Sequence, residues 1–181
     1  MRVITGSARG RRLKEPANYD IRPTTDKVKE AMFNIIQFQL KDARVLDLFA
    51  GTGQLGIEAL SRGAASCAFV DKSVESLKIV RENLTATGLL DKAQITRTDS
   101  IQYLKSGQRF DLIFLDPPYA LDLLEKAVES IRAFDILNEN GIIVCESERD
   151  KVLPDLPADK YVKREYNYSR IKLTTYTKVS T

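Results

Sequence analysis

The run Asp116-Pro117-Pro118-Tyr119 contains the residue types needed to hold an amino group that is attached to a planar ring. Two prolines fix the backbone and supply no N–H donor, so the run offers a carboxylate and carbonyl oxygens as acceptors. The tyrosine ring could stack on a base. A proline turn between a strand and a helix would need neither the Asp nor the Tyr. We therefore expect Asp116, Pro117 and Tyr119 to be catalytic.

Three glycines, Gly51, Gly53 and Gly56, form a G-x-G-x-x-G pattern directly after the apolar segment 45–49. Glycines are needed where the backbone turns tightly and a ligand approaches with no Cβ in the way. A tight turn that binds nothing would give the same pattern. The position between a predicted strand and a predicted helix favours a cofactor loop.

Three aspartates, Asp47, Asp71 and Asp99, lie at the ends of successive apolar segments, where parallel strands meet a bound ligand. Asp71 suits the ribose of NAD or of S-adenosylmethionine equally. Asp47 would repel a pyrophosphate but suits a cationic ammonium group, which favours S-adenosylmethionine. Asp99 could accept a hydrogen bond from an adenine amino group, although any of the three could instead cap a helix. The predicted cofactor-binding residues are Asp47, Phe49, Gly51, Gly53, Asp71, Asp99, Ser100 and Asp116.

The composition excludes several kinds of chemistry. The chain has no histidine, so it lacks the usual general base and the commonest transition-metal ligand. A Ser-His or Cys-His nucleophile is therefore impossible. Cys67 and Cys145 lie inside apolar segments and should be buried thiols, not a disulfide or a metal pair. We expect no metal site.

The net charge of +3 does not by itself indicate a nucleic-acid partner, but the basic residues are unevenly distributed. Residues 1–14 contain five basic side chains and no acidic one. This segment has no apolar leader, and no stretch approaches the length of a membrane span, so a cytoplasmic location is the default expectation.

The order of the predicted elements indicates an α/β fold. The first 23 residues read as an extended arm or small hairpin, and residues 24–40 as a helix that Thr24 or Thr25 could cap. Apolar strands then alternate with amphipathic helices, which predicts a mostly parallel sheet covered on both faces. The last two strands should form an antiparallel hairpin. Predicted strands are 44–49, 66–70, 93–97, 110–115, 141–145, 161–168 and 170–178; the helices between them begin near residues 55, 74 and 123.

This order suggests a division of the chain into two parts that pack as one compact unit. Residues 1–40 would form the basic arm and its helix, and residues 41–181 the cofactor-binding domain.

The motifs together resemble the RsmD family, bacterial methyltransferases that modify the N2 amino group of a guanine in 16S ribosomal RNA. The resemblance covers nearly the whole chain, with departures at Gln54, where a small residue is common, and at Asp71, where Glu is common. It rests on the runs Gly10-Arg11-Arg12-Leu13, Arg22-Pro23-Thr24-Thr25-Asp26, Glu30-Ala31-Met32-Phe33-Asn34, Asp47-Leu48-Phe49-Ala50-Gly51-Thr52-Gly53, Glu58-Ala59-Leu60-Ser61-Arg62-Gly63, Asp116-Pro117-Pro118-Tyr119 and Glu146-Ser147-Glu148.

The resemblance implies a Rossmann-like class I fold, S-adenosyl-L-methionine as the cofactor, and 16S rRNA or the small ribosomal subunit as the partner. Arg9, Arg11, Arg12 and Arg22 would then bind RNA phosphates, although a solvated basic tail has the same composition. Three alternatives stay open: a DNA adenine-N6 methyltransferase, an NAD-dependent oxidoreductase, and a non-catalytic RNA-binding assembly factor. Asp47 and the proline motif disfavour the oxidoreductase, and the chain has no room for a base-reading DNA domain.

Overall fold

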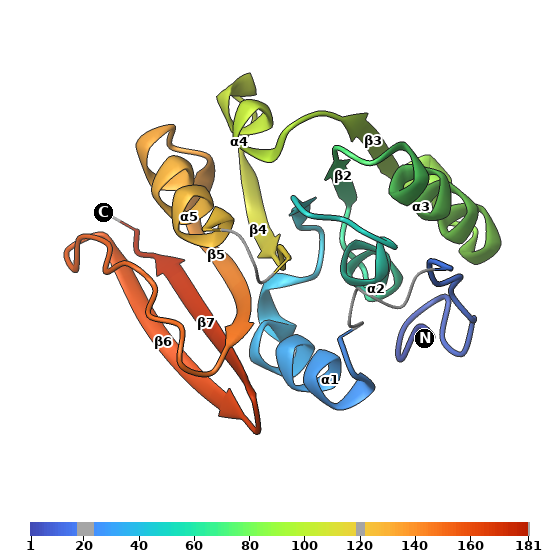
Figure 1. Ribbon diagram of the computed structural model, residues 1–181, viewed down its shortest axis with the longest axis horizontal. Helices are drawn as coiled ribbons and strands as arrows, with labels where there is room; N and C mark the ends of the chain where they lie inside the picture. The colour runs from blue at the N-terminus through green and yellow to red at the C-terminus, as the bar shows by residue number, and fades with distance from the viewer. Residues whose placement is uncertain (18–23, 119–121, 181) are drawn as a thin grey trace.

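The computed structural model describes residues 1–17, 24–118 and 122–180 (Figure 1). Within these residues the strands form one seven-stranded sheet in the order β3-β2-β1-β4-β5-β7-β6. The strands are β1 (Arg44–Asp47), β2 (Ser66–Asp71), β3 (Ala93–Arg97), β4 (Phe110–Leu115), β5 (Leu137–Glu148), β6 (Tyr161–Tyr168) and β7 (Ile171–Lys178).

The first five strands run parallel, and β7 pairs antiparallel with both β5 and β6. The predicted α/β class, with a mostly parallel sheet and a C-terminal antiparallel hairpin, is therefore confirmed. The chain order reverses beside β1, because β2 and β3 lie on one side of it and β4 on the other. Sheets of this kind bind ligands at the carboxyl ends of the strands where the order reverses.

Helices cover both faces of the sheet (Figure 1). The helices are α1 (Asp26–Ile35), α2 (Gln54–Ser61), α3 (Val74–Thr87), α4 (Ser100–Tyr103) and α5 (Leu123–Ala133). Residues of α1, α2 and α3 pack on one face, and residues of α4 and α5 on the other. Successive strand residues point to opposite faces, so Val45 joins the first core and Leu46 the second. No described helix is both long and apolar enough to cross a membrane.

The two cysteines lie on opposite faces of this sheet. Cys67 belongs to the core under α2 and α3, and Cys145 to the core under α5. Both are free and buried, as the sequence predicts, and burial raises the pKa of each thiol.

Three elements differ from the sequence-based expectation. The first helix ends at Ile35, and a tighter turn over Gln37–Gln39 leaves Phe38 exposed while Leu40 is buried. Strand β5 is longer than predicted, since Leu137 pairs with β4 before a register shift. The short helix α4, which the apolar pattern did not predict, begins where the Asp99 side chain caps it.

The segment before α1 begins with a small hairpin, here called the arm hairpin (residues 1–14). Val3 and Arg11 pair through a backbone hydrogen bond of 2.9 Å, and Arg2 faces Arg12 across an antiparallel bridge. Its apolar residues Val3, Ala8 and Leu13 are buried in the core on the α2 side of the sheet.

Candidate active site

Aspartates follow four neighbouring strands at one edge of the sheet. Asp47 ends β1, Asp71 ends β2, Asp99 follows β3 and Asp116 follows β4. Because these four strands are adjacent and parallel, their carboxyl ends meet at the same edge. The negative charge of Asp47 raises the pKa of Asp116, so the two carboxyl groups are close enough to interact electrostatically. The edge is therefore strongly acidic.

The loop between β1 and α2 has the conformation that its glycines allow. Gly51 and Gly53 have positive φ angles of 56° and 81°, a region that side-chain-bearing residues rarely adopt. A Cβ at Gly51 would meet no atom of the described residues within 4 Å, so among them this side of the loop is open to a ligand. A Cβ at Gly56 would lie 2.4 Å from the Phe69 ring, so the third glycine is required for α2 to pack on β2.

Asp47 is a buried carboxyl group beneath this loop. Its Oδ2 accepts a hydrogen bond of 3.0 Å from the backbone N–H of Gly56, in the first turn of α2. Burial is the main reason that the pKa of Asp47 rises to about 7; the Gly56 bond opposes the shift and the charge of Asp71 adds to it. A cation bound beside Asp47 would favour its ionised form.

Asp71 and Asp99 both hold backbone groups of the loops around them. Asp71 Oδ2 accepts from Gly51 N at 3.1 Å, and its Oδ1 accepts from Ser73 N at 2.9 Å. Asp99 is exposed and caps α4, because its Oδ1 accepts from two N–H groups of the first turn. Of the other predicted residues, Ser100 is buried as the first residue of α4, and Phe49 is half-buried.

The residues present fit a ligand that carries both N–H donors and a positive charge. Gln54 is buried at the start of α2, and its Oε1 has no hydrogen-bond partner among the described residues. A buried acceptor of this kind needs a donor, which a ligand amine or amide could supply. The open side of Gly51 and the acidic edge provide the remaining space and charge for such a ligand.

Asp116 lies in a polar cluster that the sequence analysis did not predict. The Thr24 hydroxyl lies 3.3 Å from Asp116 Oδ2 and 2.8 Å from Glu146 Oε2 in β5. Burial and the negative charges of Glu146 and Asp47 raise the pKa of Asp116 well above its usual value. Pro117 is buried beside this cluster. Tyr119 and Arg22 lie outside the described residues.

Glu146 and Thr24 are the functional candidates that sequence reasoning missed. Both fall inside motifs of the resemblance, yet no local pattern connects residues that are 122 positions apart. A useful signal was available: Glu146 is a carboxylate at the end of the apolar run 142–145, where a buried strand residue would be expected. Thr24 was considered only as a helix cap, and Thr25 has that role.

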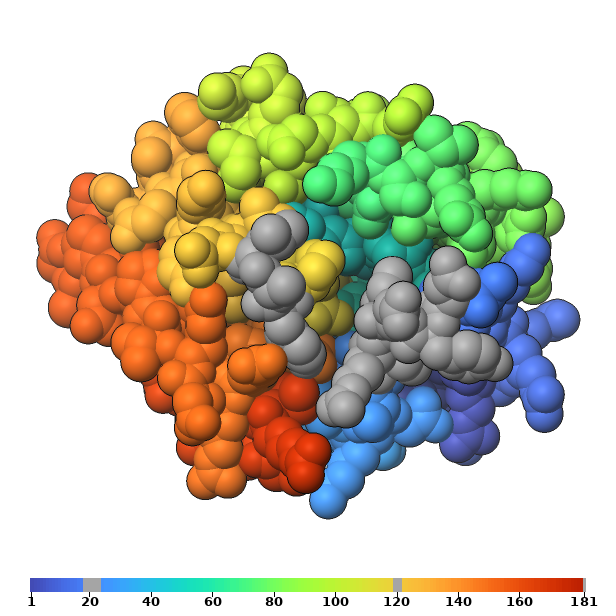
Figure 2. All heavy atoms as spheres, viewed as in Figure 1, coloured from blue at the N-terminus to red at the C-terminus, as the bar shows by residue number. Residues whose placement is uncertain are grey.

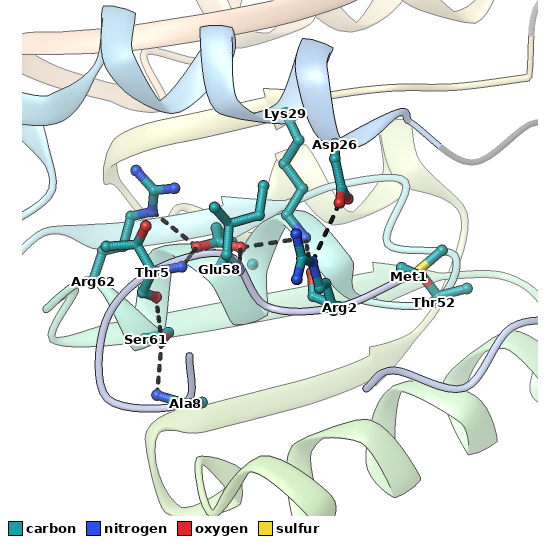
Figure 3. A network of polar contacts seen from close by, with 12 residues as sticks. Met1, Arg2, Thr5, Ala8, Asp26, Lys29, Thr52, Glu58, Ser61 and Arg62 are labelled. Carbon is teal, nitrogen blue, oxygen red and sulfur yellow. Dashed lines mark hydrogen bonds and ion pairs between the residues drawn. The ribbon is translucent and has the colours of Figure 1, made fainter. Parts of the chain in front are cut away.

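The arm hairpin is attached to α2 through a buried carboxylate (Figure 3). Glu58 accepts hydrogen bonds from the backbone N–H groups of Ile4 and Thr5, at 2.8 and 3.0 Å. It also pairs with Lys29 Nζ at 3.3 Å and with Arg62 Nε at 2.9 Å. Burial lowers the pKa of Lys29, and the Glu58 charge opposes that shift.

The serine one turn further along α2 completes the attachment. Ser61 Oγ accepts from Ala8 N at 2.9 Å and donates to the Thr5 carbonyl. A Cβ at Gly6 would lie 1.9 Å from the Ser61 carbonyl oxygen, so the arm hairpin can lie this close to α2 only with glycine there. Arg9, Arg11 and Arg12 of the arm hairpin are exposed. The hairpin lies beside α3 at the edge of the molecule (Figure 2), where Lys14 pairs with Glu82 at 2.7 Å.

Comparisons with known proteins agree with this geometry. A family model described as "Conserved hypothetical protein 95" matches residues 1–177. The Ribosomal RNA small subunit methyltransferase D of Escherichia coli is 36% identical over 91% of this chain and 83% of its own length. The Bacillus subtilis protein YlbH is 42% identical over 98% of this chain and 99% of its own length. The solved structure of the Escherichia coli protein yhhF has a TM-score of 0.88 and 33% identity, and covers 100% of this chain and 99% of that one.

The chain belongs to the RsmD family. It is a methyltransferase with the class I fold, as its motifs predict. The same fold occurs at 16% identity in an RNA methyltransferase from Salinibacter ruber, whose structure contains S-adenosyl-L-homocysteine; the TM-score is 0.67, with 88% of this chain and 95% of that one covered.

Proposed function

We propose that this protein methylates the exocyclic N2 amino group of a guanine in 16S ribosomal RNA. The cofactor is S-adenosyl-L-methionine, which supplies an electrophilic methyl group when bound. The rRNA substrate follows from relatives named Ribosomal RNA small subunit methyltransferase D. The observation that carries the proposal is the acceptor pair after β4, the Asp116 carboxyl group and the Pro117 backbone, beside the glycine loop and Asp47.

Asp116 and Pro117 are proposed to orient the target amine. The lone pair of the guanine amine is delocalised into the ring, which makes the amine a poor nucleophile. If the Asp116 carboxylate and the Pro117 carbonyl each accept one N–H, the nitrogen can become pyramidal and aim its lone pair at the methyl group. Holding two reactants at near-attack distance contributes much of the rate enhancement by itself. Tyr119 would stack on the base, which must be unpaired or extruded to reach the site.

The remaining residues are proposed to bind the cofactor and the RNA. Asp47, Gly51 and Gly53 would hold the methionine portion, with Phe49 alongside, and Asp71 the ribose. The Asp71 carboxylate has enough lone pairs to accept from a ribose hydroxyl as well as from its two backbone donors. Asp99 and Ser100 would contact the adenine. Arg9, Arg11, Arg12 and Arg22 would bind phosphates of the RNA, either naked or in the small ribosomal subunit.

Methyl transfer from labelled cofactor to 16S rRNA tests the proposal, with naked RNA and assembled 30S particles as parallel substrates. Nucleoside analysis of the product should yield N2-methylguanosine. Label in an adenine nucleoside, or transfer to duplex DNA alone, would contradict the proposed target. Absence of any transfer in both substrates would favour a non-catalytic assembly role. Calorimetric titration supplies a second check, since tighter binding of NAD than of S-adenosylhomocysteine would contradict the cofactor assignment.

A further inference from the structure

The carboxyl groups of Asp116 and Glu146 lie on either side of one hydroxyl group. Thr24 Oγ1 is close enough to bond both, at 3.3 and 2.8 Å, but it has only one hydrogen to donate. The shorter contact is the one to Glu146. The hydroxyl can turn to donate to either ionised group, but both contacts are hydrogen bonds at the same time only if one of the two carboxyl groups carries a proton. The geometry is therefore that of a carboxyl pair that holds a proton between its two members.

The surroundings of the pair favour retention of that proton. Burial raises the pKa of Asp116, and the negative charges of Glu146 from β5 and of Asp47 from β1 raise it further. Burial also raises the pKa of Glu146, while its hydrogen bonds with Thr24 and Asp116 lower it. Thr24, in the segment before α1, lowers the pKa of Asp116 as well. Two like charges this close in a buried site cannot both ionise readily.

One side of the pair opens to the surface. Glu146 lines a pocket together with Pro117, Pro118 and Lys151. The ammonium group of Lys151 is held by Glu125 at 2.7 Å. Glu146 therefore accepts from Thr24 and also lines this pocket.

Methyl transfer to an amine creates a proton that must be removed. A nitrogen–carbon bond forms, and the carbon–sulfur bond breaks with its electron pair left on sulfur. The amine keeps both N–H bonds in that step and becomes a cation. One N–H bond must then break, its electron pair returning to nitrogen, and a positioned base accelerates such a transfer.

We propose that Glu146 is a positioning residue that receives this proton through Thr24 after Asp116 has taken it from the methylated amine. Asp116 donates its new proton to Thr24 Oγ1, and the Thr24 hydroxyl passes its own hydrogen to Glu146 Oε2. Glu146 then releases the proton to the pocket. This inference rests on the proposed function, because it requires that the target is an amine held by Asp116.

The first experiment measures the titration of Asp116 and Glu146 in the cofactor-free protein. The carboxyl carbons of Asp and Glu are labelled with ¹³C, and their NMR shifts are followed against pH. Glu146→Gln removes a negative charge and should move the Asp116 titration to lower pH. Thr24→Val removes a donor and should move it to higher pH, whereas Thr24→Ser should leave it unchanged. Asp116 is assigned by comparison with Asp116→Asn.

The second experiment measures how Asp116 and Glu146 affect the pH dependence of methyl transfer. Single-turnover methyl transfer is measured against pH at saturating cofactor. If Asp116 must be ionised to accept the proton, the acid limb should move to lower pH in Glu146→Gln and to higher pH in Thr24→Val. Loss of the relay should also lower the plateau rate on the order of 10²-fold in both variants. Thr24→Ser should restore the rate, and Glu129→Gln, an exposed glutamate of α5, should change neither quantity.

The outcomes separate this inference from the proposed function. If the wild-type protein methylates guanine but neither the NMR titration nor the acid limb moves in Glu146→Gln and Thr24→Val, the relay is wrong. If the protein does not methylate guanine, the proposed function fails while the NMR titration still tests the pair. If Glu146→Gln fails to fold, as judged by circular dichroism and S-adenosylhomocysteine affinity, the comparison of Thr24→Val with Thr24→Ser decides the question: a shift in the first and none in the second supports the relay, and equal behaviour contradicts it.

Discussion

Two carboxylate sites in this molecule, one fully buried and one partly buried, have opposite surroundings. Glu58 is fully buried, yet it has two cations beside it, Lys29 and Arg62, and accepts two backbone N–H groups of the arm hairpin. Asp116 and Glu146 share the single hydroxyl of Thr24, and the charges that raise the pKa of Asp116 are negative. Among residues 1–17, 24–118 and 122–180, the first site has cations that compensate its charge and the second has none.

The difference shows how the same chemical group, a carboxyl group away from solvent, serves two purposes. A buried carboxylate with counter-cations and donors stays ionised and ties elements together, so its value lies in stability. A carboxyl group that is shielded from water beside other negative charges has a raised pKa, which suits proton transfer in a reaction. The comparison predicts that substitution of Glu58 lowers the free energy of unfolding, whereas substitution of Asp116 lowers the rate of methyl transfer.

The largest effect is expected for Glu58→Ala. Removal of the carboxylate leaves Lys29 buried without its partner and two backbone donors of the arm hairpin unsatisfied. The free energy of unfolding should fall by about 3–5 kcal/mol, measured by urea denaturation. Glu82→Ala, which removes the exposed ion pair with Lys14, should have little effect because solvent screens it. If residues 1–40 and 41–181 unfold together, each variant should show a single unfolding transition. If Glu58→Ala is as stable as Glu82→Ala, the role assigned to Glu58 is wrong.

Asp116→Ala should have the opposite effect to Glu58→Ala: the stability should be kept and the reaction rate lowered. The variant should fold and bind the cofactor, while its single-turnover rate falls on the order of 10²–10³-fold, as for the loss of one preorganised polar partner. Asp116→Asn keeps a carbonyl acceptor of the same shape and should retain part of the activity. A folded Asp116→Ala protein that reacts at nearly the wild-type rate would remove Asp116 from the mechanism.

A triple change of Arg9, Arg11 and Arg12 to Ala should affect RNA affinity alone. The dependence of log affinity on log salt should flatten by roughly 0.7–0.9 per phosphate contact that is lost. The cofactor affinity should be unchanged, because these side chains are exposed and none of them is among the predicted cofactor-binding residues. Arg132→Ala, an exposed arginine of α5, serves as the control. An unchanged salt dependence would mean that the arm hairpin presents solvated charges only.

The smallest effect is expected at Asp47. Its pKa of about 7 in the free protein means that it is largely protonated at pH 6 and ionised at pH 8. Since the ionised form attracts the ammonium group of the cofactor, affinity for S-adenosylhomocysteine should rise about tenfold between these pH values. Asp47→Asn should bind more weakly, with no such pH dependence, by calorimetry. Affinity that is constant with pH in the wild-type protein would place the ammonium group elsewhere.

Much of the fold could be predicted because its signals are local. The apolar runs of β1, β2 and β4, the turn before α2 and the aspartates at the strand ends all follow from residues close together in sequence. Helix α4 is too short to show an apolar period, so the sequence favours a ligand contact for Asp99 and leaves a helix cap as the alternative. The structure gives Asp99 a capping role, and the adenine contact stays a proposal.

The parts that could not be predicted depend on contacts between distant segments. Glu58 meets Ile4 across 54 positions, and Thr24 meets Glu146 across 122. Neither periodicity nor propensity indicates which strand end Thr24 will contact, because that contact depends on how the whole sheet and α1 pack. The arm hairpin is an example, since the sequence predicts an extended arm or small hairpin but does not indicate that its backbone is fixed to α2.

The placement of the two cysteines gives each face of the sheet its own reporter. Cys67 is enclosed by the core beneath α2 and α3, and Cys145 by the core beneath α5. A buried thiol reacts with an alkylating reagent only when its surroundings open, so its labelling rate measures the free energy of that opening. Mass spectrometry of the two peptides would thus show whether the layer that carries the arm hairpin separates from the sheet before the layer of α5, or whether both open in one event.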